Sequence, residues 1–168
     1  MWSFKNSVGR KKSEGLFALL LLIFIFVACA RTQPADFKAG EYRCEFCRMD
    51  IVDMRFKAEV LTRKGKVHRF DSIECMMGWW LGRPEEAPGR WVSDFYHPEK
   101  WVYLEKAYLL KGKRLTSPMG ASLAAFSSKE ELDRALGEFG GKALNLGELE
   151  DFIRREWKKT AVDASLRE

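Results

Sequence analysis

The stretch that decides the fold runs from Phe56 to Trp80 and reads FKAEVLTRKGKVHRFDSIECMMGWW. From Phe56 onward, apolar residues alternate with charged ones, which is the period of a half-buried strand. Residues 63–66 place a glycine among basic residues and predict a turn, and residues 67–70 begin a return strand. We therefore predict a β-hairpin over residues 53–70.

After Phe70 the apolar period changes from that of a strand to that of a helix. Asp71-Ser72-Ile73-Glu74 has the pattern of a capping box, with Asp71 as the predicted N-cap and Glu74 reaching back to it. Cys75 lies in the first turn of this helix, either as a buried small hydrophobe or as a further thiol near a site. The apolar face of the helix is formed by Ile73, Met76, Met77 and Trp80.

A similar stretch occurs further along the chain. Residues 126–130 match residues 70–74 in register, and each set follows a predicted strand and opens a predicted helix. Further strands are predicted over 91–96, 101–110, 121–126 and 142–146, and further helices from Ser128 and over 148–160. The sequence therefore predicts an α+β fold in which two small halves pack together.

Length and composition favour one compact domain after an N-terminal targeting segment. The chain has 168 residues, of which 46% are apolar and 13% aromatic, which is too apolar for a disordered protein. Most of the net charge of +5 belongs to residues 1–28, and the remainder has no long run of basic residues. This distribution argues against nucleic-acid binding.

The N-terminus predicts export. A basic segment ends at Lys12, and residues 16–28 are an apolar run that is shorter than the roughly 20 residues a spanning helix needs. Phe26-Val27-Ala28-Cys29 resembles a bacterial lipobox, with Phe26 where leucine is usual. We predict a lipoprotein signal peptide over 1–28 with lipid attachment at Cys29; cleavage nearby or an uncleaved anchor are alternatives that also export the chain.

The parts of the mature chain follow from this boundary. Residues 29–42 are polar and aperiodic and are predicted to be a lipid-anchored tether. Residues 43–160 are predicted to be the folded domain, and residues 161–168 a flexible tail. The domain would then face the periplasm or the cell exterior.

The sulfur-rich stretch Cys44-Glu45-Phe46-Cys47-Arg48-Met49 suggests a metal site. Thiols and thioethers select Cu(I), zinc or iron–sulfur centres. In an exported protein a Cys44–Cys47 disulfide is a plain alternative, and structural zinc held with His68 and Cys75 is another. A thioredoxin-like motif requires a helix after Cys47, whereas the following residues alternate toward a strand.

Two more side chains are candidates for the same site. Met119 lies between a proline and a glycine in Ser117-Pro118-Met119-Gly120, a context with little helix or strand in which to bury it. His97 precedes a proline and is either a ligand or an ordinary loop histidine. No catalytic motif or Ser/His/Asp set is present in the sequence, so we do not expect an enzyme.

These motifs, in their order and spacing, resemble the NosL family of lipoprotein accessory factors of nitrous oxide reductase. The usual family form of the cysteine motif is C-x-x-C-G-M, and Arg48 here replaces the glycine. The resembling segments are the lipobox-like Cys29, Cys44–Met49, Phe56–Glu59, Phe70–Cys75, Ser117–Gly120, Ala125-Phe126 and Gly140-Gly141.

The resemblance implies a fold of two ββαβ-like halves and a Cu(I)-binding metallochaperone. It would deliver copper to nitrous oxide reductase, or to another copper enzyme, with a NosDFY-type transporter complex and the membrane as partners. The rival hypotheses are a thiol-dependent enzyme, such as a disulfide oxidoreductase or an organomercurial-lyase-like protein, and a structural zinc or disulfide module.

The site hypothesis combines both sulfur motifs. We expect Cys47, Met49 and Met119 to bind Cu(I), with Cys44 close by and Cys75 or His97 as extra ligands. Thioethers bind more weakly than thiolates, which suits a carrier that must release its ion. The hypothesis predicts that Met49 and Met119, which are far apart in the sequence, meet in space.

Overall fold

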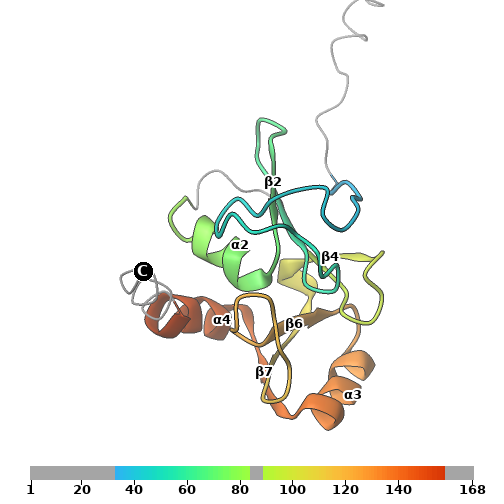
Figure 1. The fold of residues 1–168 in the computed structure, drawn as a ribbon. Helices are drawn as coiled ribbons and strands as arrows, with labels where there is room; N and C mark the ends of the chain where they lie inside the picture. The colour runs from blue at the N-terminus through green and yellow to red at the C-terminus, as the bar shows by residue number, and fades with distance from the viewer. Residues whose placement is uncertain (1–32, 84–88, 158–168) are drawn as a thin grey trace, which may run out of the picture. The chain divides into compact units, whose positions relative to one another are not determined.

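The computed structural model describes residues 33–83 and 89–157 of the chain. The predicted signal peptide, Cys29 and the predicted tail lie outside these residues. Among the described helices, none combines the length and the apolar character needed to cross a bilayer. The described part contains two antiparallel sheets and three α-helices, which confirms the predicted α+β class (Figure 1).

The first half is built on the predicted hairpin. Strand β1 (Ala58–Leu61) pairs with β2 (Val67–Phe70), and Ala58 lies opposite Phe70. Helix α2 (Ile73–Trp80) follows, and β3 (Gly89–Ser93) returns to pair with the other edge of β1. Strand β4 (Trp101–Tyr103) adds to β3, which gives a sheet of order β2-β1-β3-β4.

The second half repeats this connectivity. Strand β5 (Tyr108–Gly112) is central, with β6 (Leu123–Phe126) on one edge and β7 (Gly141–Leu144) on the other. Helix α3 (Lys129–Phe139) connects the two edge strands. Helix α4 (Leu146–Phe152) then continues as a π-helical turn, η3 (Ile153–Trp157), which packs against α2.

Backbone contacts show that the two halves are related. Ala58 opposite Phe70 in the first half corresponds to Tyr108 opposite Phe126 in the second. Two further hydrogen bonds correspond in the same way: Glu45 N donates to Arg69 O at 2.9 Å, and Phe95 N donates to Ala125 O at 2.9 Å. Each half is therefore a ββαβ unit, and the repeat expected from residues 70–74 and 126–130 extends to the loop before the first strand.

Two details of the sequence prediction are wrong. Ser72, not Asp71, is the N-cap of α2: its side chain accepts from Cys75 N at 3.3 Å. The predicted strand 101–110 is broken by a 3₁₀ turn, η2 (Leu104–Lys106), where the chain leaves the first sheet for the second. Leu104 is buried at this break, so it contributes to the core without belonging to either sheet.

The segment before residue 43 also packs on the domain. Phe37 is 7% exposed and its ring lies edge-on to Tyr42. Lys57, a buried residue directly before β1, pairs with Asp36 at 2.8 Å. The folded part therefore begins earlier than the predicted tether boundary.

Candidate metal centre

The cysteine loop is a tight turn fastened to the first sheet. Cys44 N donates to Met49 O at 2.8 Å, and Arg48 N donates to Cys44 O at 3.0 Å. The bond from Glu45 N to Arg69 O ties the loop to β2. Arg48 closes the turn with a φ of 67°, a conformation that costs a side-chain-bearing residue about 1 kcal/mol. The glycine usual in the family form would adopt this conformation without that cost.

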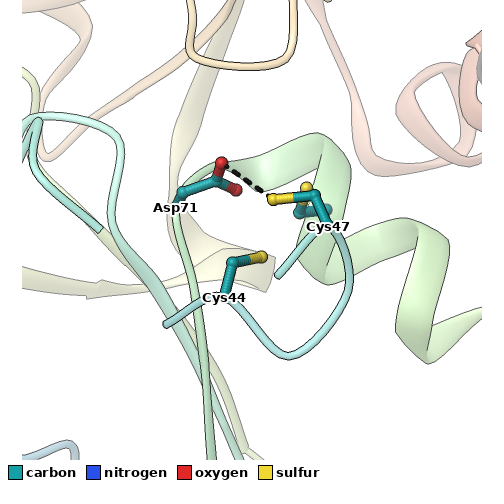
Figure 2. A group of neighbouring side chains, drawn as sticks. Cys44, Cys47 and Asp71 are labelled. Atoms are coloured by element: carbon teal, nitrogen blue, oxygen red, sulfur yellow. Dashed lines mark hydrogen bonds between the residues drawn. The ribbon is translucent and has the colours of Figure 1, made fainter. Parts of the chain in front are cut away.

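Four side chains meet where this loop approaches the first turn of α2. One ligand atom from each of Cys44, Cys47, Asp71 and Cys75 lies within 4.8 Å of the others. Figure 2 shows Cys44 and Cys47 pointing from their loop toward Asp71, which follows directly on β2. Cys44, Cys75 and Asp71 are buried and Cys47 is half-buried, so the cluster is accessible through Cys47. Three sulfurs and one carboxylate form a donor set that suits a soft metal ion.

The cysteines are free thiols that differ in acidity. A hydrogen bond from the Cys75 thiol lowers the pKa of Cys44 to about 7. Burial, together with the charges of Asp71 and Cys44, raises the pKa of Cys47 to about 12. The pKa of Cys75 is raised because its proton is held by Cys44 and because it is buried. One thiolate is thus favoured among two protonated thiols, and no Cys44–Cys47 disulfide is present.

Asp71 is the member of the cluster that sequence reasoning assigned to another role. Its Oδ2 accepts from the Cys47 thiol at 3.2 Å, and its Oδ1 accepts from Ser72 Oγ at 3.2 Å. Because Ser72 caps the helix, the Asp71 carboxylate is available to the thiols. Asp71 could have been identified from its spacing of four residues from Cys75, because this spacing places one residue at the end of a strand and the other in the first turn of the following helix.

The turn that carries Met119 is fastened to the same helix. The buried Glu74 carboxylate, next to Cys75, accepts hydrogen bonds from Ser117 Oγ and from Ala121 N. Trp157 Nε1 donates to Met119 O at 3.5 Å. Met119 itself is half-buried against the main core. Glu74, which was expected to close a capping box, instead joins the two halves behind the cluster.

Phe46 holds the cysteine loop against α2. A Cβ atom on Gly78 would lie 2.8 Å from Trp157 Cζ3 and 3.1 Å from Phe46 Cζ, so glycine is needed for this close approach. The Phe46 and Trp157 rings have centroids 5.6 Å apart. Trp157 therefore contacts both the Met119 turn and the residue that precedes Cys47. The two sulfur motifs are linked through one aromatic side chain.

Met49 and His97 lie differently from the thiols. Met49 is 45% exposed at the end of the cysteine loop. A meeting of its sulfur with that of Met119 stays a prediction. His97 belongs to another network, in which Nδ1 lies 3.7 Å from Glu99 and Nε2 lies 3.4 Å from Glu131. It is not a member of the four-residue cluster.

The fold and the cluster together define a class: a two-fold repeat of ββαβ units with a thiol-rich site that could hold a metal ion. The NosL family model matches residues 34–153. The chain therefore belongs to the NosL family, as the motifs of its sequence indicated.

Two relatives agree with this membership. The copper-binding lipoprotein NosL of Stutzerimonas stutzeri is 27% identical over 159 residues, covering 84% of this chain and 83% of its own length. The crystal structure of the copper chaperone NosL from Shewanella denitrificans superposes with a TM-score of 0.62 at 20% identity, covering 70% of this chain and 96% of that one. Both names describe copper-handling proteins, in agreement with the expectation that this chain is not an enzyme.

Proposed function

We propose that this chain is an exported, lipid-anchored metallochaperone that binds Cu(I) and delivers it to a copper enzyme, nitrous oxide reductase being the first candidate. The carrying observation is the cluster of Cys44, Cys47, Cys75 and Asp71 in a member of a family whose relatives are named for copper. Thiolate donors favour Cu(I) over hard cations. The half-buried Cys47 provides a side from which the ion can be passed on.

The proposed ligands are Cys44 and Cys47 with the thioethers of Met49 and Met119, and Cys75 as an additional donor. Cys44 is the thiolate that binds first, because its pKa is lowered to about 7. Cys47 then loses its proton, and Asp71 Oδ2 is the adjacent acceptor. We leave His97 out of the set, because Glu99 and Glu131 face its ring nitrogens.

The mixture of thiol and thioether ligands would allow the bound copper ion to be exchanged. Met49 is exposed and offers a neutral ligand that a partner's donor can replace without creating a buried charge. The buried thiols remain protected on the inner side. Copper would therefore leave from the Met49 side of the loop.

Competition with a chromogenic Cu(I) chelator under reducing conditions tests the site. We expect Cys47→Ser to lower the Cu(I) affinity at least a hundredfold and Met49→Leu/Met119→Leu to lower it about tenfold. Met54→Leu is the matched control, since Met54 is a half-buried methionine outside both motifs. Unchanged affinity in the double methionine variant would remove the thioethers from the ligand set.

Zinc is the second candidate ion, because three thiols and a carboxylate also match the four donors of a tetrahedral zinc site. Titration of the same protein with Zn²⁺ compares the two ions. Tight zinc binding with an affinity that is unaffected by both methionine substitutions would favour a structural zinc module. A thiol–disulfide exchange assay on the metal-free protein tests the thiol-enzyme alternative, for which we expect no turnover.

Delivery and anchoring need separate experiments. Copper-loaded protein mixed with copper-free nitrous oxide reductase, with and without a NosDFY-type complex, should transfer its metal to the enzyme. Cys29→Ala should move the exported protein from the membrane fraction to the soluble fraction. Retention of the variant in the membrane would point to an uncleaved anchor.

A further inference from the structure

A basic pocket lies directly beside the cysteine loop. Its volume is about 730 Å³, and one wall is the loop itself, with Glu45, Phe46 and Arg48. The turn of the β1–β2 hairpin contributes Thr62, Arg63, Lys64 and Lys66, and His68 and Trp79 also line the pocket. Among the described residues that line it, five are basic and one is acidic: Arg48, Arg63, Lys64, Lys66 and Arg83 against Glu45.

The described lining residues of this pocket do not balance its positive charge. Glu45 is shared, with one carboxylate oxygen 3.6 Å from His68 Nδ1 and the other 3.9 Å from Arg48. Within residues 33–83 and 89–157, no carboxylate lies within ion-pair distance of the three basic side chains of the hairpin turn, Arg63, Lys64 and Lys66. Charges crowded in a concave surface concentrate the electrostatic potential there.

Arg48 connects this pocket to the proposed cargo site. It lies between Cys47 and Met49, its side chain is 72% exposed, and its weak pair with Glu45 can be exchanged for a stronger one. Its positive φ is retained in spite of a conformational cost, as is common at functional positions. An anion held by its guanidinium would touch the loop that carries the ligands.

We propose that this pocket docks an acidic segment of the protein with which copper is exchanged, an inference that rests on the proposed function. Arginine forks match carboxylates in bidentate geometry, and the remaining cations would steer the approach of an acidic surface. The pocket also has aromatic walls, Phe46 and Trp79, which a peptide chain entering it can contact. A flat lipid surface cannot fill a concave site of this kind.

The test uses metal-free protein and a fluorescently labelled deca-glutamate peptide as probe. The pocket variant is Arg63→Glu/Lys64→Glu/Lys66→Glu. The matched control, Lys100→Glu/Lys106→Glu/Lys113→Glu, changes the net charge equally at exposed residues that do not line the pocket. We expect the pocket variant to bind the peptide at least tenfold more weakly than the control. Equal losses in both variants would overturn the proposal.

Arg48→Gly gives a second variant in which the fold is preserved, because glycine accepts the positive φ without strain. We expect it to weaken peptide binding while leaving the thermal midpoint unchanged or higher. Amide chemical-shift changes on adding the peptide should concentrate in residues 45–48, 62–68 and 79–83. Changes spread evenly over the surface, or unaltered peptide affinity in Arg48→Gly, would contradict the assignment.

Two further measurements separate this proposal from its alternatives. Anionic phosphatidylglycerol vesicles replace the peptide in a parallel assay, and selective loss of vesicle binding in the pocket variant, with peptide binding unchanged, would overturn docking in favour of a lipid surface. The Cu(I) affinity is measured on the pocket variant and on its matched control, and it should not change in either. A failure of copper binding in the parent protein would refute the proposed function, whereas a failure of docking would appear only in the peptide assay.

Discussion

At the scale of single residues, Asp71 acts on the half-buried thiol of Cys47. Its carboxylate accepts a hydrogen bond from the Cys47 thiol and lies close to the other two sulfurs. Burial is the main reason that the pKa of Cys47 rises to about 12, and the Asp71 charge adds to it. The same aspartate would become the proton acceptor when a metal ion displaces that proton.

Asp71→Asn should therefore lower the pKa of Cys47, although burial keeps it above the value of a free thiol. The measurement is the pH dependence of alkylation, resolved for each cysteine by mass spectrometry. Asp50→Asn is the control, since Asp50 is exposed and pairs with Arg43 at 3.5 Å. An alkylation midpoint of Cys47 that does not move in Asp71→Asn would show that the aspartate charge does not act on this thiol.

Glu74 couples pH to stability through its burial. Desolvation raises its pKa to about 7 from an ordinary value of 4.5, and the hydrogen bonds from Ser117 and Ala121 only partly oppose that rise. Below about pH 4.5 the carboxyl is protonated in both the folded and the unfolded protein, so the full stability is present. As the pH rises toward 7 the unfolded state loses its proton first, and about 3 kcal/mol of unfolding free energy is lost.

Chemical denaturation of the metal-free protein between pH 4.5 and 8 measures this effect. Glu74→Gln keeps an acceptor for Ser117 and Ala121 but cannot ionise. We expect the unfolding free energy of the variant to fall less steeply over this window, with the largest gain over the parent near neutral pH. Identical pH profiles would show that Glu74 has an ordinary pKa.

At the scale of elements, α2 is the support of the site. Its first turn carries Cys75 and Glu74, its N-cap is Ser72, and its Gly78 receives the rings of Phe46 and Trp157. The cysteine loop, the Met119 turn and the last helical segment all meet on this one short helix. Changes on α2 should therefore affect both stability and metal binding.

Gly78→Ala and Gly137→Ala form a matched pair in two helices. Alanine normally stabilises a helix interior by about 1 kcal/mol relative to glycine. Nothing lies within 4 Å of a Cβ at Gly137, so we expect that variant to gain up to this amount. At Gly78 the overlap with Trp157 and Phe46 should cost about 1–3 kcal/mol and outweigh the gain. Urea denaturation gives both values; a stabilised Gly78→Ala would show that the rings move aside freely.

At the scale of the whole molecule, the thiol cluster occupies one of two positions that the internal repeat makes equivalent. The positions of Cys44 and Cys47 before β1 correspond to those of Asp94 and His97 before β5. In the same way, Cys75 is the third residue after the N-cap of α2, and Glu131 is the third residue after the N-cap of α3. In the second half Asp94 accepts from Ser127 N at 2.7 Å, and Glu131 faces His97. The repeat thus has a cluster of thiols in the first half and a network of oxygen and nitrogen groups in the second.

The comparison between halves predicts different outcomes for two substitutions. Cys75→Ser should lower the Cu(I) affinity about tenfold or more, because it removes a buried sulfur of the cluster. His97→Ala should leave that affinity unchanged, because its ring lies in the counterpart network. Chelator competition measures both, and a comparable loss in His97→Ala would return the histidine to the ligand set.

The local sequence pattern was sufficient to predict most helices and strands and to identify the cysteines and methionines that are candidate ligands. The hairpin, the helices that begin at Ile73 and Lys129, and the repeat between them follow from apolar period and capping, which depend on neighbours in the chain. The break at Leu104 was missed, because nothing in its immediate neighbours distinguishes a strand that continues from one that changes sheets.

The sequence by itself determined the fold class, the internal repeat and the family, because these depend on periodicity and on motif order along the chain. Only the tertiary structure decided which residues meet. It placed Asp71 with the thiols, moved Glu74 from a helix cap to a buried link with the Met119 turn, and set His97 apart. The physical reason is that a cluster of ligands requires side chains from different elements to converge, and convergence is set by packing between elements.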